Sequence, residues 1–184
     1  MKLHLGCGQD YREGYVNVDF TDDVKVDKIM DLEEELPLED NSVEEVIANH
    51  VFEHIENFIE LIHELHRVCK PGAIIKIKTP FYSAWGQYND PTHVRFFTPY
   101  TFNYFKKGEY SHEVGCYEDM FDVKKVQINF GIGSSSKLNP IINPIVNFSH
   151  KFYCRFFAWT FPCAEIEYEL EVLKTSNKNK EVEE

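Results

Sequence analysis

Two short apolar runs at the start of the chain constrain its fold more than any other feature. The first, in a predicted strand over 3–7, stops at a Gly-Cys-Gly turn, and the second, in a predicted strand over 15–20, ends on Asp19. Glycines after a strand let a ligand approach the backbone closely, because no Cβ stands in the way. An acid at the tip of the neighbouring strand can accept hydrogen bonds from two ribose hydroxyls. The pattern predicts an α/β protein with a nucleoside site at the ends of its first two strands.

The rest of the chain alternates strand-like and helix-like patterns. Apolar repeats at i, i+3 and i+4 predict a helix over 57–69, and Thr98-Pro99 opens a short helix through Phe105. Further strands are predicted at 24–30, 45–49, 73–79, 121–130 and 164–173. Strands separated by helical stretches predict a mainly parallel sheet. Only about eight residues separate the first two strands, where a parallel crossover usually takes a dozen or more, so the first helix is one turn or absent.

Composition limits the class of protein. A chain of 184 residues with 43% apolar residues is expected to form one packed domain. Its net charge of −12 disfavours nucleic acid as a partner. The five cysteines include no C-x-x-C pair, which disfavours a disulfide framework or structural zinc and favours a reducing cytoplasm. Neither a signal peptide nor a membrane span is predicted, although peripheral contact with a membrane and a homodimer both stay open.

Six segments in order carry a family resemblance: LHLGCG, VNVDF, IMDL, VEEVIANHVFEHI, HRVCKPGAIIKIKTP and DPTHVRFFTPYTF. Together they resemble a small class I, Rossmann-like S-adenosylmethionine-dependent methyltransferase of the type 11 group, over roughly residues 3–130. The resemblance implies a three-layer α/β fold with a C-terminal antiparallel strand and a shortened first helix. It also implies one methyltransferase domain at 1–173, with substrate-side segments at 81–110 and 131–163 and a flexible tail at 174–184.

The same resemblance implies a site for S-adenosylmethionine at the first two strands. There the turn of Gly6, Cys7 and Gly8 lies against the methionine part of the cofactor. Asp19 holds the ribose hydroxyls, in agreement with the need of a diol for a bidentate acceptor, and Phe20 lies near the adenosine. A turn that merely ends a strand is the ordinary alternative for the glycines.

Later strands are implied to complete the cofactor site. Asp31 accepts from the adenine amino group and Leu32 packs beside the base, although an acid at this position is also a common helix cap or turn residue. Asn49 and His50 border the methionyl end and the transferred methyl group. A nicotinamide dehydrogenase is the nearest rival, but its G-x-G-x-x-G motif requires glycine where this chain has Tyr11.

A different chemistry is suggested by His50-Val51-Phe52-Glu53-His54. This matches the H-x-x-E-H pattern in which two histidines on a continuous helix bind zinc and the glutamate activates water. The motif straddles the end of a predicted strand, and methyltransferases often carry a similar stretch here. We therefore expect no metal, with a zinc hydrolase as the less favoured alternative.

The acceptor is expected to bind at the loop after the fifth strand, which is rich in aromatic side chains with a few polar groups, as suits a small organic molecule. Its substrate-side candidates are Tyr82, Trp85, Tyr88, Asp90 and Arg95. His93 is the candidate general base, because its pKa lies near working pH, and an equal alternative is that it only orients the loop. Arg95 would pair a substrate carboxylate or phosphate, or Asp90.

The apolar segment 141–161 is predicted to be partly helical, and core packing is its simplest interpretation. A lid, a dimer face and an interfacial helix on a membrane are the alternatives. The resemblance implies a methyltransferase acting on a small molecule, most favourably at oxygen, with a weak preference for a sugar or lipid-linked acceptor, and a cytoplasmic location is expected. A non-catalytic cofactor-binding subunit is the second hypothesis.

Overall fold

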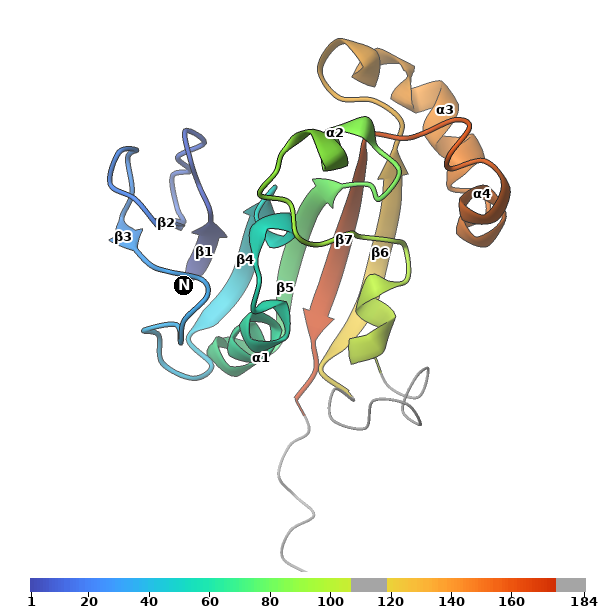
Figure 1. Ribbon diagram of the computed structural model, residues 1–184. Helices are drawn as coiled ribbons and strands as arrows, with labels where there is room; N and C mark the ends of the chain where they lie inside the picture. The colour runs from blue at the N-terminus through green and yellow to red at the C-terminus, as the bar shows by residue number, and fades with distance from the viewer. Residues whose placement is uncertain (107–118, 175–184) are drawn as a thin grey trace, which may run out of the picture.

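A single seven-stranded sheet organises the computed structural model of the chain, which describes residues 1–106 and 119–174 (Figure 1). The strand order across the sheet is β3-β2-β1-β4-β5-β7-β6. The strands are β1 (Lys2–Leu5), β2 (Val16–Asp19), β3 (Lys28–Ile29), β4 (Val43–Asn49), β5 (Cys69–Pro80), β6 (Phe121–Asn129) and β7 (Glu165–Val172).

Six of the seven strands run in the same direction, and the last one in the sequence, β7, is reversed. Neighbours among β1 to β5 pair in parallel, whereas β7 pairs antiparallel with both β5 and β6. The predicted α/β fold, with its mainly parallel sheet and C-terminal antiparallel strand, is confirmed. Because β7 is reversed, its first residue lies at the edge of the sheet where the parallel strands end.

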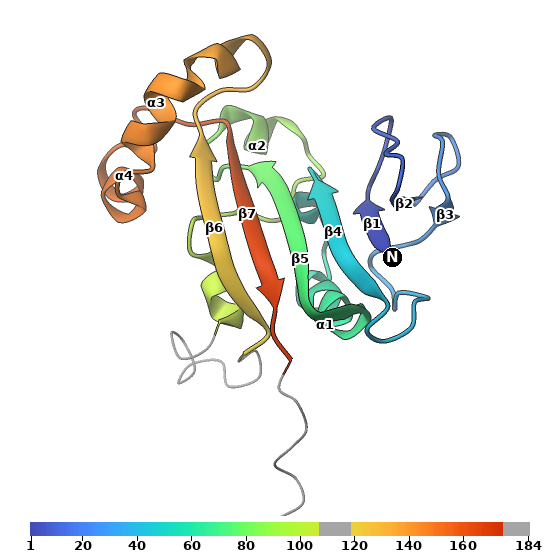
Figure 2. The same ribbon diagram turned by 180° about the vertical axis from the view of Figure 1, so that it is seen from behind.

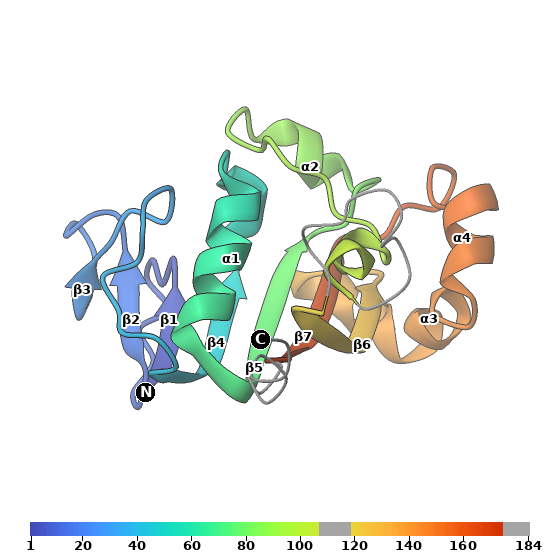
Figure 3. The ribbon, with the colours of Figure 1, turned by 90° about the horizontal axis from the view of Figure 1, so that it is seen from below.

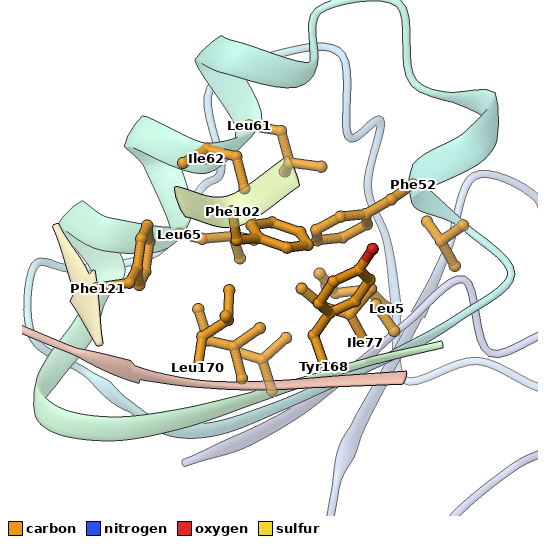
Figure 4. Close-up of a cluster of buried hydrophobic side chains, with 14 of the residues drawn as sticks. Leu5, Phe52, Leu61, Ile62, Leu65, Ile77, Phe102, Phe121, Tyr168 and Leu170 are labelled. Atoms are coloured by element: carbon orange, nitrogen blue, oxygen red, sulfur yellow. The ribbon is translucent and has the colours of Figure 1, made fainter. Parts of the chain in front are cut away.

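The main helix covers one face of this sheet. It is α1 (Phe58–Val68), close to the range predicted, and its apolar stripe of Leu61, Ile62 and Leu65 packs onto β5 and β7 (Figure 4). The helix ends where predicted, but β5 begins at once at Cys69. The shorter helices are η1 (Phe52–His54), α2 (Trp85–Asn89), η2 (Thr101–Phe105), η3 (Gly133–Leu138), α3 (Asn139–Val146) and α4 (His150–Phe156).

No helix among the described residues lies over the opposite face of the sheet (Figure 2). This face carries cross-strand ion pairs instead: Glu45 accepts from Lys2 at 2.7 Å and from Lys76 at 2.8 Å, and Lys78 lies 3.1 Å from Glu167. A parallel sheet is usually covered on both faces. The methyltransferase-like sheet is therefore present, while the described residues lack the second helical layer that a three-layer fold implies. Charged side chains at alternate strand positions make the uncovered face compatible with water.

The connection between β1 and β2 contains turns and bends but no helix, so the first helix is absent rather than shortened. The buried side chain of Asn17 organises this connection. Its Oδ1 accepts from the backbone N–H of Arg12 at 2.8 Å, and its Nδ2 donates to the carbonyls of Arg12 and Tyr15. Side-chain hydrogen bonds of this kind replace the helical ones in a loop too short for a crossover helix.

The structure differs from the prediction in two segments, the loop after the fifth strand and residues 141–161. α2 lies inside the predicted loop after the fifth strand, where the sequence predicts no helix. α3 and α4 lie beside the β6 edge of the sheet (Figure 3), and their large side chains are mostly exposed, so the core packing expected for 141–161 is wrong. Residues 107–110 of the predicted 81–110 segment and the tail from 175 lie outside the described residues. The domain boundaries stay a prediction.

Candidate active site

A pocket of about 490 Å³ opens where β1, β2 and β4 end, at the carboxyl edge of the parallel strands. Ligands of open α/β sheets bind at this edge, where the strand order reverses between β1 and β4. The lining residues come from the ends of these strands and from the loops that follow them: Gly6, Asp19, Phe20, Met30, Asp31, Leu32, His50, Val51, His54, Ile55 and Thr92.

The glycine turn after β1 depends on the absence of side chains. Gly6 has φ +56°, and a Cβ there would lie 2.4 Å from Cγ2 of Val51. Gly8 has φ +50° with open space around it, and its N–H donates to Oδ2 of Asp19 at 2.8 Å. Left-handed backbone is inexpensive only for glycine, so the sequence Gly-Cys-Gly is what allows this turn.

Asp19 is held rigidly at the wall of the pocket. Its side chain is mostly buried, and Oδ1 accepts from the N–H of Phe20 at 2.9 Å. Each carboxylate oxygen has two lone pairs, so one on each stays available to a ligand diol. The Phe20 ring is 80% exposed while lining the pocket, which leaves an aromatic face for a base to stack on. Met30 and Leu32 supply an apolar floor beside the exposed carboxylate of Asp31.

These residues fit the cofactor implied by the sequence. S-adenosylmethionine combines a flat base, a ribose diol and a charged amino-acid end. The pocket offers an aromatic face, a buried carboxylate fixed by two backbone amides, and a glycine turn that a Cβ would obstruct. Its volume lies in the ordinary range of about 300–1,000 Å³ for small-molecule sites. Gly6, Asp19, Phe20, Asp31, Leu32 and His50 are all brought together here.

Three predicted cofactor residues, Cys7, Gly8 and Asn49, do not line this pocket. The thiol of Cys7 is buried and faces the carbonyls of Gly8 and Lys25. Asn49 lies on the uncovered face of the sheet, in a shallow depression with Lys78 and Glu167, because successive strand residues point to opposite faces. The structure does not bring Asn49 to the cofactor pocket.

His50 lies between this pocket and a second one. It has a left-handed φ of 53° at the end of β4, and its two ring nitrogens donate to Glu165 at 2.8 Å and to Glu53 at 3.2 Å. These two hydrogen bonds raise the pKa of His50 to about 9, and the bond to Glu165 contributes more than the bond to Glu53. Glu53 is fully buried and accepts a further hydrogen bond from Thr79 at 3.0 Å. At neutral pH His50 is an imidazolium held between two carboxylates.

The second pocket, of about 610 Å³, lies between α2 and the loops on either side of α3 and α4. It contains two of the predicted substrate-side residues, Trp85 and Asp90, and the candidate base His93, together with His50 and Glu165. Nδ1 of His93 lies 3.1 Å from the carbonyl of Gln87, which can only accept, so Nδ1 carries the proton. Whenever the ring is neutral, the lone pair is therefore on Nε2, 3.9 Å from Asp90. This tautomer is the one a general base requires.

The other three substrate-side candidates are structural in the described chain. The Tyr82 hydroxyl donates to the carbonyl of Cys154, and the Tyr88 hydroxyl donates to the carbonyl of Tyr82. Arg95 donates to the carbonyls of Ile55 and Glu56, and so ties the loop to the chain after η1 instead of pairing with Asp90. None of the three lines the second pocket.

The zinc-peptidase hypothesis fails on backbone geometry. His50 is in a left-handed conformation and only Phe52–His54 is helical, so His50 and His54 do not share the face of one helix. A different group, Glu53, His54 and His93, has ligand atoms within 4.8 Å of one another. Both oxygens of Glu53 already accept hydrogen bonds, from His50 and Thr79. We assign this group to the packing between the two pockets.

Sequence reasoning missed Glu165, which lines the second pocket and pairs with His50. The signal was present: Glu165 is the first residue of the last strand, and an antiparallel last strand begins at the edge where the parallel strands end. Its neighbours Glu167 and Glu169 alternate with apolar residues on the wet face, and this regular pattern concealed the different position of the first glutamate.

The comparisons agree with this geometry. Residues 3–77 match a family described as a methyltransferase domain. No curated protein matches the chain. A structure of a SAM-dependent methyltransferase from Archaeoglobus fulgidus is similar with a TM-score of 0.58 and 20% identity, covering 92% of this chain and 85% of that one. The YcgJ protein from Bacillus subtilis has a TM-score of 0.56 and 14% identity, with 95% and 92% covered.

A complex that contains the Haloferax volcanii Trm112 methyltransferase activator is also similar, with a TM-score of 0.54 and 16% identity, covering 94% of this chain and 81% of that one. At these identities the structures show the fold, and the family match covers the strands that build the first pocket. Residues 3–77 are thus similar to a methyltransferase domain, and the sheet as a whole has the fold of S-adenosylmethionine-dependent methyltransferases.

Proposed function

We propose that this domain transfers the methyl group to a hydroxyl oxygen of a small acceptor bound in the second pocket. The observation that carries the proposal is that the two pockets share His50. A cofactor in the first pocket and an acceptor in the second would meet at this residue. Holding two reactants in line supplies much of the rate of a methyl transfer.

His93 is proposed as the general base. Bound S-adenosylmethionine supplies an electrophilic methyl group, and a hydroxyl that attacks it must lose a proton. His93 lines the acceptor pocket with Asp90 3.9 Å from its Nε2, whereas the imidazolium of His50 has no lone pair to offer below about pH 9. His50 and its two carboxylates instead form a rigid wall between the pockets.

The acceptor pocket suits a sugar or the sugar of a lipid-linked molecule. Trp85 is largely exposed at its rim and offers an aromatic face, and Asn89, Asp90 and Glu165 offer hydrogen-bonding groups around it. Aromatic surface combined with a few convergent polar groups is typical of a site that orients a polyhydroxyl ligand.

Two measurements test the proposal. Calorimetric titration with S-adenosylhomocysteine should show one site, and transfer of a labelled methyl group should be found with a member of a panel of sugars, lipid-linked sugars and simple alcohols. His93→Gln should lower turnover by about 10²–10⁴-fold without changing S-adenosylhomocysteine affinity. His63→Gln, at an exposed histidine on α1, is the matched control. Full turnover in His93→Gln would remove the base from the mechanism.

A non-catalytic subunit, or an enzyme that depends on an activator, is the second candidate. The specific observation is the incomplete covering of the sheet: β3 has two residues at one edge, and no described helix lies over the second face. The similar Haloferax structure contains a methyltransferase activator. Turnover by the purified chain alone would exclude this candidate. The proposed compartment is a reducing cytoplasm, in keeping with the four unpaired cysteines of the described residues.

A further inference from the structure

Helix α3 is attached to the protein by its polar side. Asn139, Asn143 and Asn147 recur at i, i+4 and i+8 and face the free edge of β6. Asn147 accepts from the N–H of Ile128 and donates to its carbonyl, both at 2.7 Å. Asn143 accepts from the next free N–H, that of Phe130, at 2.9 Å. Asn139 exchanges two hydrogen bonds with Gly131. The asparagines thus satisfy the backbone groups of the sheet edge, as a further strand would.

This attachment leaves the apolar side of α3 in solvent. Ile145 is 70% exposed and Phe148, at the corner before α4, is 92% exposed. On α4 the exposed aromatic pair of Phe152 and Phe156 continues the same surface. Ile145, Phe148 and Phe152 border an open apolar groove of about 710 Å³ between the helices. An ordinary surface helix buries its apolar face, so the orientation of α3 is inverted.

The charge of this surface is opposite to that of the whole chain. The protein carries a net charge of −12, yet no acidic residue occurs between Asp122 and Glu165. Lys137 precedes α3, and Lys151 and Arg155 are exposed on α4 beside the aromatic pair. An apolar, aromatic surface flanked by basic residues is typical of helices that lie in the plane of an anionic membrane.

We propose that the α3–α4 surface, formed by residues 137–159, binds the interface of an anionic phospholipid bilayer. No described helix is long and apolar enough to cross a bilayer. The charge pattern favours this occupant over a second copy of the chain. A two-fold contact would place this basic surface against itself, without an acid on it to pair with Lys151 or Arg155.

The α3–α4 surface is continuous with the acceptor pocket. Phe130 lines that pocket and stacks on Phe161, which lines the apolar groove between α3 and α4, with ring centroids 5.2 Å apart. Trp159 packs against Tyr82 behind α2 at 5.5 Å. A bilayer seated on the surface would therefore bring lipid-linked acceptors close to the pocket. This last step alone rests on the proposed function, and the binding itself does not.

Vesicle sedimentation tests the proposal. The full chain should sediment with vesicles of phosphatidylcholine and phosphatidylglycerol, much less with phosphatidylcholine alone, and less as salt rises. The double variant Ile145→Ser, Phe148→Ser should lower partitioning by about tenfold or more. Ile29→Ser, which removes a comparably exposed isoleucine (58%) at the opposite edge of the sheet, is the matched control and should bind as wild type does.

A second double variant, Lys151→Gln with Arg155→Gln, tests the contribution of the basic residues. It should weaken binding to anionic vesicles only. S-adenosylhomocysteine titration of every variant shows that the fold and the cofactor site are intact. Equal binding by the serine double variant and by wild type would overturn the proposal. The proposal would also be overturned if the wild-type protein did not bind vesicles but formed a dimer in solution, and the serine double variant were monomeric. Methyl transfer to a soluble acceptor is measured separately, so failure of the proposed function is distinguishable from failure of membrane binding.

Discussion

Replacing Gly6 by alanine tests the glycine turn quantitatively, because Gly8 offers a matched position. Both residues have left-handed φ angles, +56° and +50°, but only at Gly6 does a Cβ meet another atom, Cγ2 of Val51 at 2.4 Å. The backbone penalty should be about 1–2 kcal/mol at either position. Overpacking against the mostly buried Val51 should add about 1–3 kcal/mol at Gly6 alone. We expect Gly6→Ala to cost about 2–5 kcal/mol and Gly8→Ala about 1–2 kcal/mol.

Urea unfolding at pH 7 measures both costs, and a double-mutant cycle isolates the contact. Val51→Ala should remove the clash, so in the Gly6→Ala background it should restore about 1–3 kcal/mol relative to the sum of the single variants. Affinity for S-adenosylhomocysteine should follow the same order, because Gly6 and Val51 both line the pocket. Equal destabilisation by Gly6→Ala and Gly8→Ala, or an additive cycle, would refute the packing argument.

Three further changes probe the charges of the structure. Asp19→Asn should weaken S-adenosylhomocysteine binding about ten- to a hundredfold in calorimetry. The amide side chain carries no negative charge, and its NH₂ group cannot accept from the backbone N–H donors or the ligand diol. His50, whose pKa is raised to about 9, should stabilise the protein fully below about pH 6.5 and lose this contribution as pH rises through about 9. The unfolding free energy of wild type minus that of His50→Gln should fall by about 1–2 kcal/mol across this window, discounted for exposure of the ring. Glu45, whose pKa is lowered to about 2 by Lys2 and Lys76, should contribute above about pH 4.5 and lose the contribution as pH falls through about 2. Glu45→Gln should cost about 1–2 kcal/mol at pH 7, and the exposed control Glu44→Gln a few tenths.

The strands and the main helix could be predicted because local patterns determine them. Alternation of apolar and charged residues in β5 and β7, and the apolar stripe of α1, are properties of short windows of sequence. The helix predicted over 57–69 ends within one residue of the end of α1 at Val68. The start of β5 at Cys69 depends on pairing of Val43 with Cys69 across the sheet, which no window contains.

The site could be predicted only to the level of strand ends. The positions of Gly6 and Asp19 could be predicted because they follow the ends of the first two strands. Asn49 points to the other face of the sheet, because a shift of one residue along β4 changes the face to which a side chain points. Arg95 makes bonds to the carbonyls of Ile55 and Glu56, which lie far from it in the sequence. Glu165 belongs to the site only because β7 is reversed. Each of these outcomes depends on tertiary placement that composition and periodicity do not encode.

Two exposed surfaces of this protein are built in opposite ways, and the contrast supports the interpretation of both. The face of the sheet without a described helix is covered by ion pairs such as those of Glu45 with Lys2 and Lys76, so water can solvate it without a partner. In the α3–α4 segment the asparagine side chains hydrogen-bond to the edge of β6, and the apolar side chains of Ile145 and Phe148 are exposed to solvent. Since one exposed face of this protein carries charged side chains, solvent exposure alone does not explain why the α3–α4 surface is apolar. An apolar surface kept outward by three regularly spaced asparagines is thus better explained by an apolar neighbour, such as the bilayer, than by an incomplete core.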